Sequence, residues 1–177
     1  VLAESGNQLK LLANYGSGVD HIDVEAAHER GILVSNSPTV SSSDTADMTI
    51  ALILAVMRRF KEGSNVMESG DWQGWAPSAF LGTRVAGKTI GILGMGRIGT
   101  ALAERARAFG LNVCYHNRKK VHPDTETRLN ADYYENFHEM LSKIDILATC
   151  CPLSVETHHI LDSKALSFMK PSAVVVN

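Results

Sequence analysis

One short motif constrains the fold of this chain more than any other feature. Residues 94–99, Gly-Met-Gly-Arg-Ile-Gly, match the pattern G-x-G-x-x-G. Alone the pattern is weak evidence, but here it follows an apolar run at residues 88–93 and opens a helical pattern at residues 97–109. A second apolar run, residues 111–116, follows at the interval that a βαβ unit requires. This order predicts a parallel sheet with a dinucleotide bound at the glycine turn; a glycine turn without a ligand is the simpler alternative.

Each glycine of the motif has a separate expected role. Gly94 permits the tight turn, Gly96 lets the backbone approach a pyrophosphate closely, and Gly99 lets the helix pack on the strand. The start of the helix supplies free N–H groups and the positive end of a helix dipole, which favour a bound anion.

A basic cluster follows the second predicted strand, where a dinucleotide-binding chain meets the adenosine ribose. An Asp or Glu at this point accepts hydrogen bonds from the ribose 2′-hydroxyl and repels a 2′-phosphate. This chain has instead Asn117, Arg118, Lys119 and Lys120. The planar guanidinium of Arg118 suits phosphate oxygens, so the sequence predicts NADP (NADPH) as cofactor, with NAD less favoured. A solvated basic loop is the alternative interpretation.

The rest of the chain also alternates between strand and helix patterns, which predicts an α/β fold with a Rossmann-like, doubly wound parallel sheet. Asp23 is expected to cap a short helix. A long helix, apolar nearly all round, is expected over residues 44–60, buried between domains or against a second subunit. An extended connection is expected over residues 70–88, and a polar loop before a helix over residues 135–144. The remaining expected elements are strands at 9–14, 32–36, 145–151 and 173–177 and a helix at 162–169.

Composition argues against several classes of partner. The net charge is only −2, so no overall field favours nucleic acid or an anionic membrane. The longest apolar run, residues 48–57, is far shorter than the roughly 20 residues that span a bilayer. Three cysteines form no disulfide framework and suggest reduced thiols in a cytoplasmic protein, and seven histidines without ligand spacing predict no metal site.

Because the chain opens on Val1 and stops at Asn177 after an apolar strand pattern, we expect a fragment of a longer protein.

Several motifs in order resemble one family. These are "GSGVDHIDVEAAHERGILVSN", "DTADMTIALILA", "GDWQGWAP", "GKTIGILGMGRIG", "CYHNRKK", "CPLSVETHHIL" and "MKPSAVVVN". The chain resembles the D-isomer-specific 2-hydroxyacid dehydrogenases, most closely their glyoxylate/hydroxypyruvate reductase branch. The resemblance implies a partial, flavodoxin-like substrate domain over residues 1–43 and an interdomain or dimerisation helix and loop over residues 44–87. Residues 88–177 would form the NAD(P)-binding Rossmann domain, truncated at its C-terminal end.

The resemblance also assigns expected roles to individual residues. Ser17 and Gly18 match the loop whose N–H groups hold the substrate carboxylate, with Ser17 also near the nicotinamide. Trp75, with Trp72, matches a pair typical of the glyoxylate reductase branch. In that branch the second Trp can reach the neighbouring subunit's substrate, so Trp75 is expected to limit substrate size; plain interface packing is an equal alternative.

The expected cofactor contacts follow from the same resemblance. Arg97 and Ile98 match residues over the pyrophosphate, and residues 117–119 match the segment that grips the 2′-phosphate. Cys151 and Pro152 match positions that flank the adenosine. Relatives often have a hydroxylated residue in place of Cys151, so the thiol implies a weaker hydrogen bond.

The family's catalytic Arg, Glu and His match nothing in this sequence, so no catalytic residue is assigned. The leading hypothesis is a homodimer that reduces a small 2-keto acid, glyoxylate or hydroxypyruvate, to the D-2-hydroxy acid by hydride transfer from NADPH. Two alternatives remain: a dehydrogenase for a bulkier 2-keto acid, and a dinucleotide-sensing protein like a corepressor. If the 177 residues act alone, we expect a binding module without dehydrogenase activity.

Overall fold

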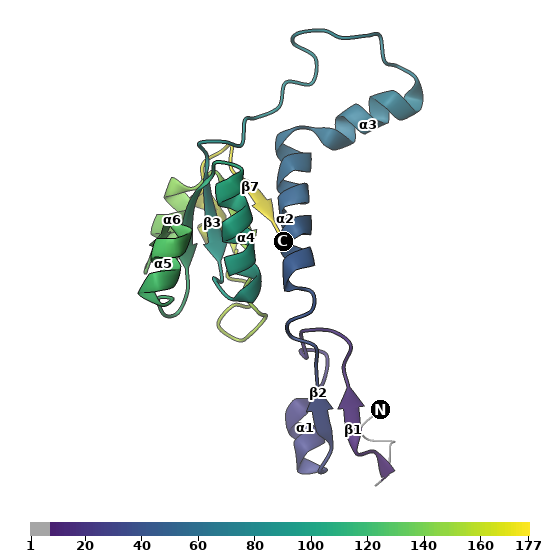
Figure 1. Ribbon diagram of the computed structural model, residues 1–177, viewed down its shortest axis with the longest axis vertical. Helices are drawn as coiled ribbons and strands as arrows, with labels where there is room; N and C mark the ends of the chain where they lie inside the picture. Colours follow the sequence, from purple (N-terminus) through teal and green to yellow (C-terminus); the bar gives the residue numbers. More distant parts are fainter. Residues whose placement is uncertain (1–7) are drawn as a thin grey trace. The chain divides into compact units, whose positions relative to one another are not determined.

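The computed structural model describes residues 8–177, and the chain divides into two compact units (Figure 1). The first unit ends at Ser42 and the second runs from Ser43 to Asn177.

The first unit contains one βαβ arrangement. Strand β1 (Leu11–Ala13) pairs in parallel with β2 (Leu33–Ser35). Helix α1 (Val24–Glu29) connects them, and the side chain of Asp23 accepts a hydrogen bond of 2.9 Å from Ala26 N at its start. The predicted strands, helix and cap are therefore confirmed.

The second unit is built on five parallel strands in the order β5-β4-β3-β6-β7. The strands are β3 (Thr89–Leu93), β4 (Asn112–His116), β5 (Ala131–Tyr133), β6 (Ile146–Thr149) and β7 (Val174–Val176). Along the chain, β3, β4 and β5 follow one another toward one edge of the sheet, and β6 and β7 then follow one another toward the other edge. The strand order therefore reverses between β3 and β6, and in such sheets a ligand crevice forms at the carboxyl ends of the strands at this point. The predicted Rossmann-like α/β fold is confirmed.

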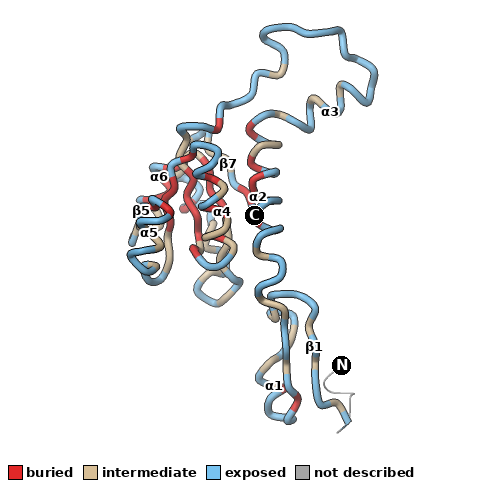
Figure 2. The backbone as a smooth tube through the Cα atoms, viewed as in Figure 1, coloured by how far each residue is buried: buried red, intermediate tan, exposed pale blue. Residues whose placement is uncertain are grey.

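Both faces of this sheet are covered by helices. Helices α4 (Arg97–Ala108) and α5 (Pro123–Leu129) share one apolar cluster with alternate residues of the strands, including Ile90 and Ile92. Helices α6 (Phe137–Lys143) and α7 (Ser163–Ser167) share the other cluster, with Leu93, Cys114 and Leu147. Figure 2 shows the buried residues concentrated along the central strands. The two clusters are those of a doubly wound sheet.

The long helix differs from its prediction. Helix α2 (Ser42–Met57) buries one face, with Ala46, Ile50 and Ile53 in the core of the second unit, whereas Met48 is 60% exposed. It begins at Ser42, before the predicted start at residue 44. It ends before residue 60, because Arg59 adopts a left-handed conformation with φ 57°.

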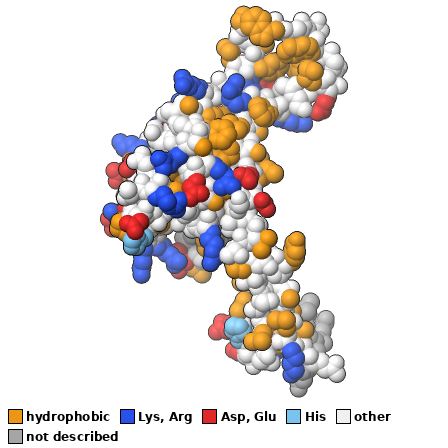
Figure 3. Space-filling model, viewed as in Figure 1, with side chains coloured by type: hydrophobic (Ala, Val, Ile, Leu, Met, Phe, Trp, Pro, Cys, Tyr) orange, Lys and Arg blue, Asp and Glu red, His pale blue; other side chains and the backbone are white. Residues whose placement is uncertain are grey.

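A further helix, α3 (Phe60–Ser69), follows that break and was not predicted. The extended connection expected after it is confirmed for most of its length, since no regular element occurs in residues 71–88. In Figure 3 apolar side chains gather over α3 and this connection. Phe60, Met67, Trp75 and Leu81 are all more than half exposed there.

The polar segment after β4 also differs from its prediction as a loop. It contains α5, which begins with Pro123 after an N-cap at His122, and the edge strand β5. Both elements are too short to produce a visible hydrophobic period.

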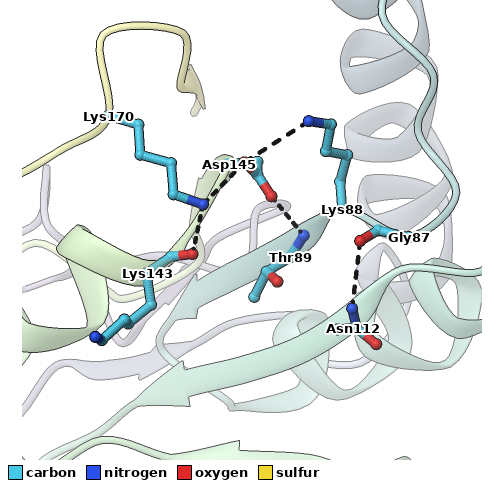
Figure 4. A network of polar contacts seen from close by, with 7 residues as sticks. All are labelled: Gly87, Lys88, Thr89, Asn112, Lys143, Asp145 and Lys170. Atoms are coloured by element: carbon cyan, nitrogen blue, oxygen red, sulfur yellow. Dashed lines mark hydrogen bonds and ion pairs between the residues drawn. The ribbon is translucent and has the colours of Figure 1, made fainter.

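A polar network joins the amino ends of three strands (Figure 4). Asp145 Oδ2 accepts a hydrogen bond of 2.9 Å from Thr89 N, and Asp145 Oδ1 lies 3.0 Å from Lys170 Nζ and 4.0 Å from Lys88 Nζ. The backbone of Asp145 also donates to Thr89 O and accepts from Val174 N. One residue therefore fixes the relative positions of β3, β6 and β7 at the end of the sheet opposite the crevice.

Candidate dinucleotide-binding site

A cleft of about 810 Å³ lies at the carboxyl ends of β3, β4 and β6. Three loops line it: the glycine turn after β3, the basic loop after β4 and the loop after β6. It contains seven of the residues predicted to contact the cofactor, namely Gly94, Gly96, Asn117, Arg118, Lys119, Cys151 and Pro152. Its position is the one that the strand order predicts.

The glycine turn tolerates no side chain at two positions. Gly94 has φ +100°, and a Cβ on it would lie 2.6 Å from Cys151 N. A Cβ on Gly99 would collide with the carbonyl oxygen of Gly94. The turn can therefore pack this closely on α4 and on the loop after β6 only with glycine at both positions.

The turn leads into the uncapped start of α4. Gly96 is the N-cap and supplies no side-chain hydrogen bond, whereas α5, α6 and α7 each have a side chain that caps the first turn. A Cβ at Gly96 would meet no atom within 4 Å, so the approach to this helix start is open. Its free N–H groups and dipole suit an anionic group such as a pyrophosphate.

Three predicted residues form the first turn of α4. Arg97 is exposed and Ile98 is half-buried, and neither lines the cleft itself. Gly99 is buried, so its part is to let α4 approach the turn, as predicted.

Asn117 is hydrogen-bonded to the glycine turn. Its side-chain oxygen accepts a hydrogen bond of 2.7 Å from Met95 N, and its carbonyl oxygen accepts one of 3.2 Å from the Tyr133 hydroxyl. This bond uses one of the two lone pairs of Oδ1, and Nδ2 adds two N–H donors. The residue that follows β4 is therefore neutral and supplies donors, whereas a carboxylate would supply only acceptors.

The basic loop is held in place from its far side. Val121 N donates a hydrogen bond of 3.1 Å to the Tyr115 hydroxyl, which itself donates to Glu126 at 2.6 Å. Burial, followed by the hydrogen bond to Glu126, raises the pKa of Tyr115 to about 12, so the hydroxyl stays protonated at neutral pH.

The basic residues of the loop separate into two groups. Arg118 and Lys119 are exposed and line the cleft. The Lys120 ammonium lies 5.2 Å from the centre of the Tyr133 ring and is not among the lining residues. Lys120 therefore does not share the cleft with Arg118 and Lys119.

The opposite wall is the loop after β6. Cys150 packs against the apolar cluster beneath α4 and Cys151 against the one beneath α6, so the adjacent thiols take opposite faces of the sheet. Burial raises the pKa of the Cys151 thiol, which keeps it neutral in the cleft.

Glu156 is the site residue that the sequence did not reveal. It lines the same cleft as Arg118, so the cleft contains a carboxylate as well as the cations of the basic loop. The pKa of Glu156 is lowered, mainly by the hydrogen bond from the Ser154 hydroxyl. The positive charge of Arg118 lowers it further. No local sequence signal marks this pairing, because the two residues come from loops after different strands.

The predicted substrate loop lies in the first unit. Asn14 Nδ2 donates to the carbonyl oxygens of Gly16 and Gly18, at 2.9 and 2.8 Å, and Asn36 Nδ2 donates to Ser17 O at 2.7 Å. These three bonds hold the carbonyl oxygens of the loop and use none of its own N–H groups, which are the groups that an anion-binding turn offers.

Trp75 stands apart from the cleft. Its side chain is 83% exposed in the connection after α3, and it is not one of the cleft residues.

Within residues 8–177, no group of three or more His, Cys, Asp or Glu side chains is placed to hold a metal ion. In the same part of the chain, every helix is too short or too polar to cross a membrane.

Comparison with known proteins identifies the family. Residues 50–177 match the model of the D-isomer specific 2-hydroxyacid dehydrogenase, NAD binding domain. The chain belongs to this family of dehydrogenases. A glyoxylate reductase of Thermococcus litoralis is 43% identical to this chain over 180 residues, covering 99% of this chain and 54% of that protein.

Solved structures agree with the family assignment. A glyoxylate reductase from Paecilomyes thermophila matches with a TM-score of 0.86 at 40% identity, over 97% of this chain and 50% of that one. An acyclic imino acid reductase in complex with NADPH and D-Arg matches with a TM-score of 0.83 at 33% identity, over 96% of this chain and 52% of that one. The chain spans about half the length of each of these proteins.

Proposed function

We propose that the chain is the cofactor-binding part of an NADPH-dependent reductase that converts a small 2-keto acid, glyoxylate or hydroxypyruvate, to the D-2-hydroxy acid. The similarity to glyoxylate reductases supports the substrate class. We retain residues 1–43 as part of the substrate domain, 44–87 as the connecting and dimerisation segment, and 88–177 as the cofactor domain.

The observation that carries the cofactor choice is the chemistry at the end of β4. Asn117 is neutral, with its oxygen bonded to Met95 N and two N–H donors on Nδ2, and Arg118 follows it with an exposed guanidinium. A 2′-phosphate offers only acceptors at neutral pH, and charge-assisted hydrogen bonds to it are stronger than neutral ones. This donor set therefore suits a 2′-phosphate, and the position after β4 lacks the carboxylate that would bind the ribose 2′-hydroxyl and repel that phosphate.

The remaining residues fit the same ligand. The uncapped start of α4, with Arg97 and Ile98 in its first turn, would hold the pyrophosphate, and Cys151 and Pro152 would flank the adenosine. The loop at Ser17 and Gly18 would hold the substrate carboxylate through its N–H groups. When bound, the dinucleotide supplies the hydride that reduces the keto carbon.

We also propose a cytoplasmic homodimer. The exposed apolar side chains of α2, α3 and the connection after them, such as Met48, Val56, Met67 and Trp75, form the surface that a second copy would cover. In that dimer Trp75 would limit the size of the substrate. Three free cysteines agree with a reducing compartment.

Calorimetric titration of the chain with NADPH and with NADH tests the cofactor choice. We expect NADPH to bind about tenfold more tightly at low ionic strength, because one charge-assisted contact is gained. The difference should shrink as salt is added. Equal or tighter binding of NADH at every salt concentration would contradict the proposal.

The substrate choice is tested separately on the natural protein that contains these residues. Steady-state kinetics with glyoxylate, hydroxypyruvate and phenylpyruvate should give the highest kcat/KM for one of the two small acids. A clear preference for phenylpyruvate would replace the proposal with a dehydrogenase for bulkier acids.

A further inference from the structure

A carboxylate is built into the wall that faces the basic loop. Ser154 Oγ donates a hydrogen bond of 2.7 Å to Glu156 Oε2. Ser154 N donates to Thr157 Oγ1 at 2.8 Å, and Thr157 Oγ1 donates to Pro152 O at 2.6 Å. The turn that carries Glu156 is therefore closed by its own side chains, and the carboxylate has a defined position at the mouth of the cleft.

Arg118, on the basic loop, lines the same cleft as Glu156. None of the ion pairs in residues 8–177 includes Arg118, and Arg118 is exposed. Both side chains line the same cleft, and the charge of Arg118 acts on Glu156 although the two are not in ion-pair contact. The hydrogen bond from Ser154 and this charge lower the pKa of Glu156, which keeps it ionised at neutral pH.

We propose that Glu156 is a specificity-determining residue, whose carboxylate opposes a 2′-phosphate for the charge of Arg118 and so limits the preference for the phosphorylated dinucleotide. This inference rests on the proposed function, because it assumes that Arg118 meets that phosphate.

The physical reason is competition between two anions for one cation. A phosphate that approaches Arg118 is attracted by the guanidinium and repelled by the carboxylate of Glu156, and this repulsion offsets part of the attraction. A dinucleotide without the 2′-phosphate brings no charge to this point and is affected little. Glu156 therefore changes the ratio of the two affinities more than it changes dinucleotide binding in general.

The test is the substitution Glu156→Gln, which removes the charge and keeps the size of the exposed side chain. Binding of NADPH and NADH to the chain is measured by calorimetry at low salt. We expect the affinity for NADPH to rise about threefold, the size typical of one exposed charge interaction, and that for NADH to change by less than about 1.5-fold. Glu135→Gln is the matched control, since Glu135 is exposed in the same unit but outside the cleft, and it should change neither affinity.

Two further measurements locate the effect. In an Arg118→Gln background, the gain from Glu156→Gln should become smaller, because the cation that both anions share is absent. Raising the salt concentration should also reduce the gain. An unchanged NADPH affinity, or an equal change for both dinucleotides, would overturn the role of Glu156.

These outcomes are separable from failure of the proposed function. Preference of the unsubstituted chain for NADH would contradict the NADPH assignment. In that case the ratio of the NADPH affinity to the NADH affinity is still compared between the unsubstituted chain and Glu156→Gln. If this ratio is the same in both proteins, the inference is overturned by itself.

Discussion

The two ends of the five-stranded sheet hold charged residues in opposite situations. At the amino ends, Asp145 is paired with Lys170 and Lys88 and also bonded to the backbone of β3. At the carboxyl ends, Arg118 and Lys119 line a cleft and form no ion pair within the described residues.

This difference separates stability from binding. A charge whose hydrogen bonds are satisfied inside the fold stabilises that fold, and it has little left to offer a ligand. A charge held at a cleft without a close partner contributes little to stability and is available to an anion. We therefore expect substitutions at the two ends to change different measured quantities.

The largest expected effect is on stability, from Asp145→Ala. The substitution removes the acceptor for Thr89 N and the ion pair with Lys170 in a part-buried site. We expect the free energy of unfolding to fall by about 2 kcal/mol, the usual cost of a lost hydrogen bond to a charged group. Urea denaturation of the chain, followed by circular dichroism, measures this.

The same variant also tests the separation. Its affinity for NADPH should match that of the unsubstituted chain when measured well below the unfolding midpoint. Glu135→Ala, at an exposed position, should change stability by less than about 0.5 kcal/mol. A loss of affinity in Asp145→Ala without any loss of stability would show that the two ends are not independent.

A smaller effect is expected at the other end, on binding, from Arg118→Gln. The affinity for NADPH should fall about tenfold, which corresponds to about 1.4 kcal/mol, while that for NADH changes little. Lys120→Gln is the matched control, because its ammonium lies over the Tyr133 ring and does not line the cleft. Calorimetry gives both affinities, and thermal unfolding should be the same for the two variants. Equal losses in the two variants would mean that the basic loop acts only through its total charge.

The sequence was sufficient to predict the turn and the strands around it, because local requirements determine them. Gly94 and Gly99 have no room for a side chain, and Asp23 and Asp162 cap helices that begin directly after them. Such features depend on a few neighbouring residues and leave a readable pattern.

The features that could not be predicted depend on contacts between distant segments. Lys119 and Lys120 are neighbours of the same type, yet Lys120 turns toward Tyr133 on β5, a strand too short to be recognised in advance. The hydrogen bond between Asn117 and Met95 joins two loops. Glu156 and Arg118 likewise come from two different loops and line one cleft. Neither pairing follows from the spacing of residues along the chain.

The smallest expected effect is a pH dependence at the amino ends of the strands. Partial burial by itself would raise the pKa of Asp145, but the hydrogen bond from Thr89 N and the charges of Lys170 and Lys88 outweigh it and hold the pKa below its usual value. A carboxyl whose pKa is lower in the folded state stabilises that state at every pH above its unfolded value, and the stabilisation is lost as the pH falls through the folded pKa. We therefore expect the difference in unfolding free energy between the natural chain and Asp145→Asn to be constant from about pH 5 to 7 and to decrease below about pH 4, by less than about 1 kcal/mol. Urea denaturation of both proteins at each pH measures it, and a difference that instead grew as the pH was lowered would exclude an ionised Asp145 as the stabilising form.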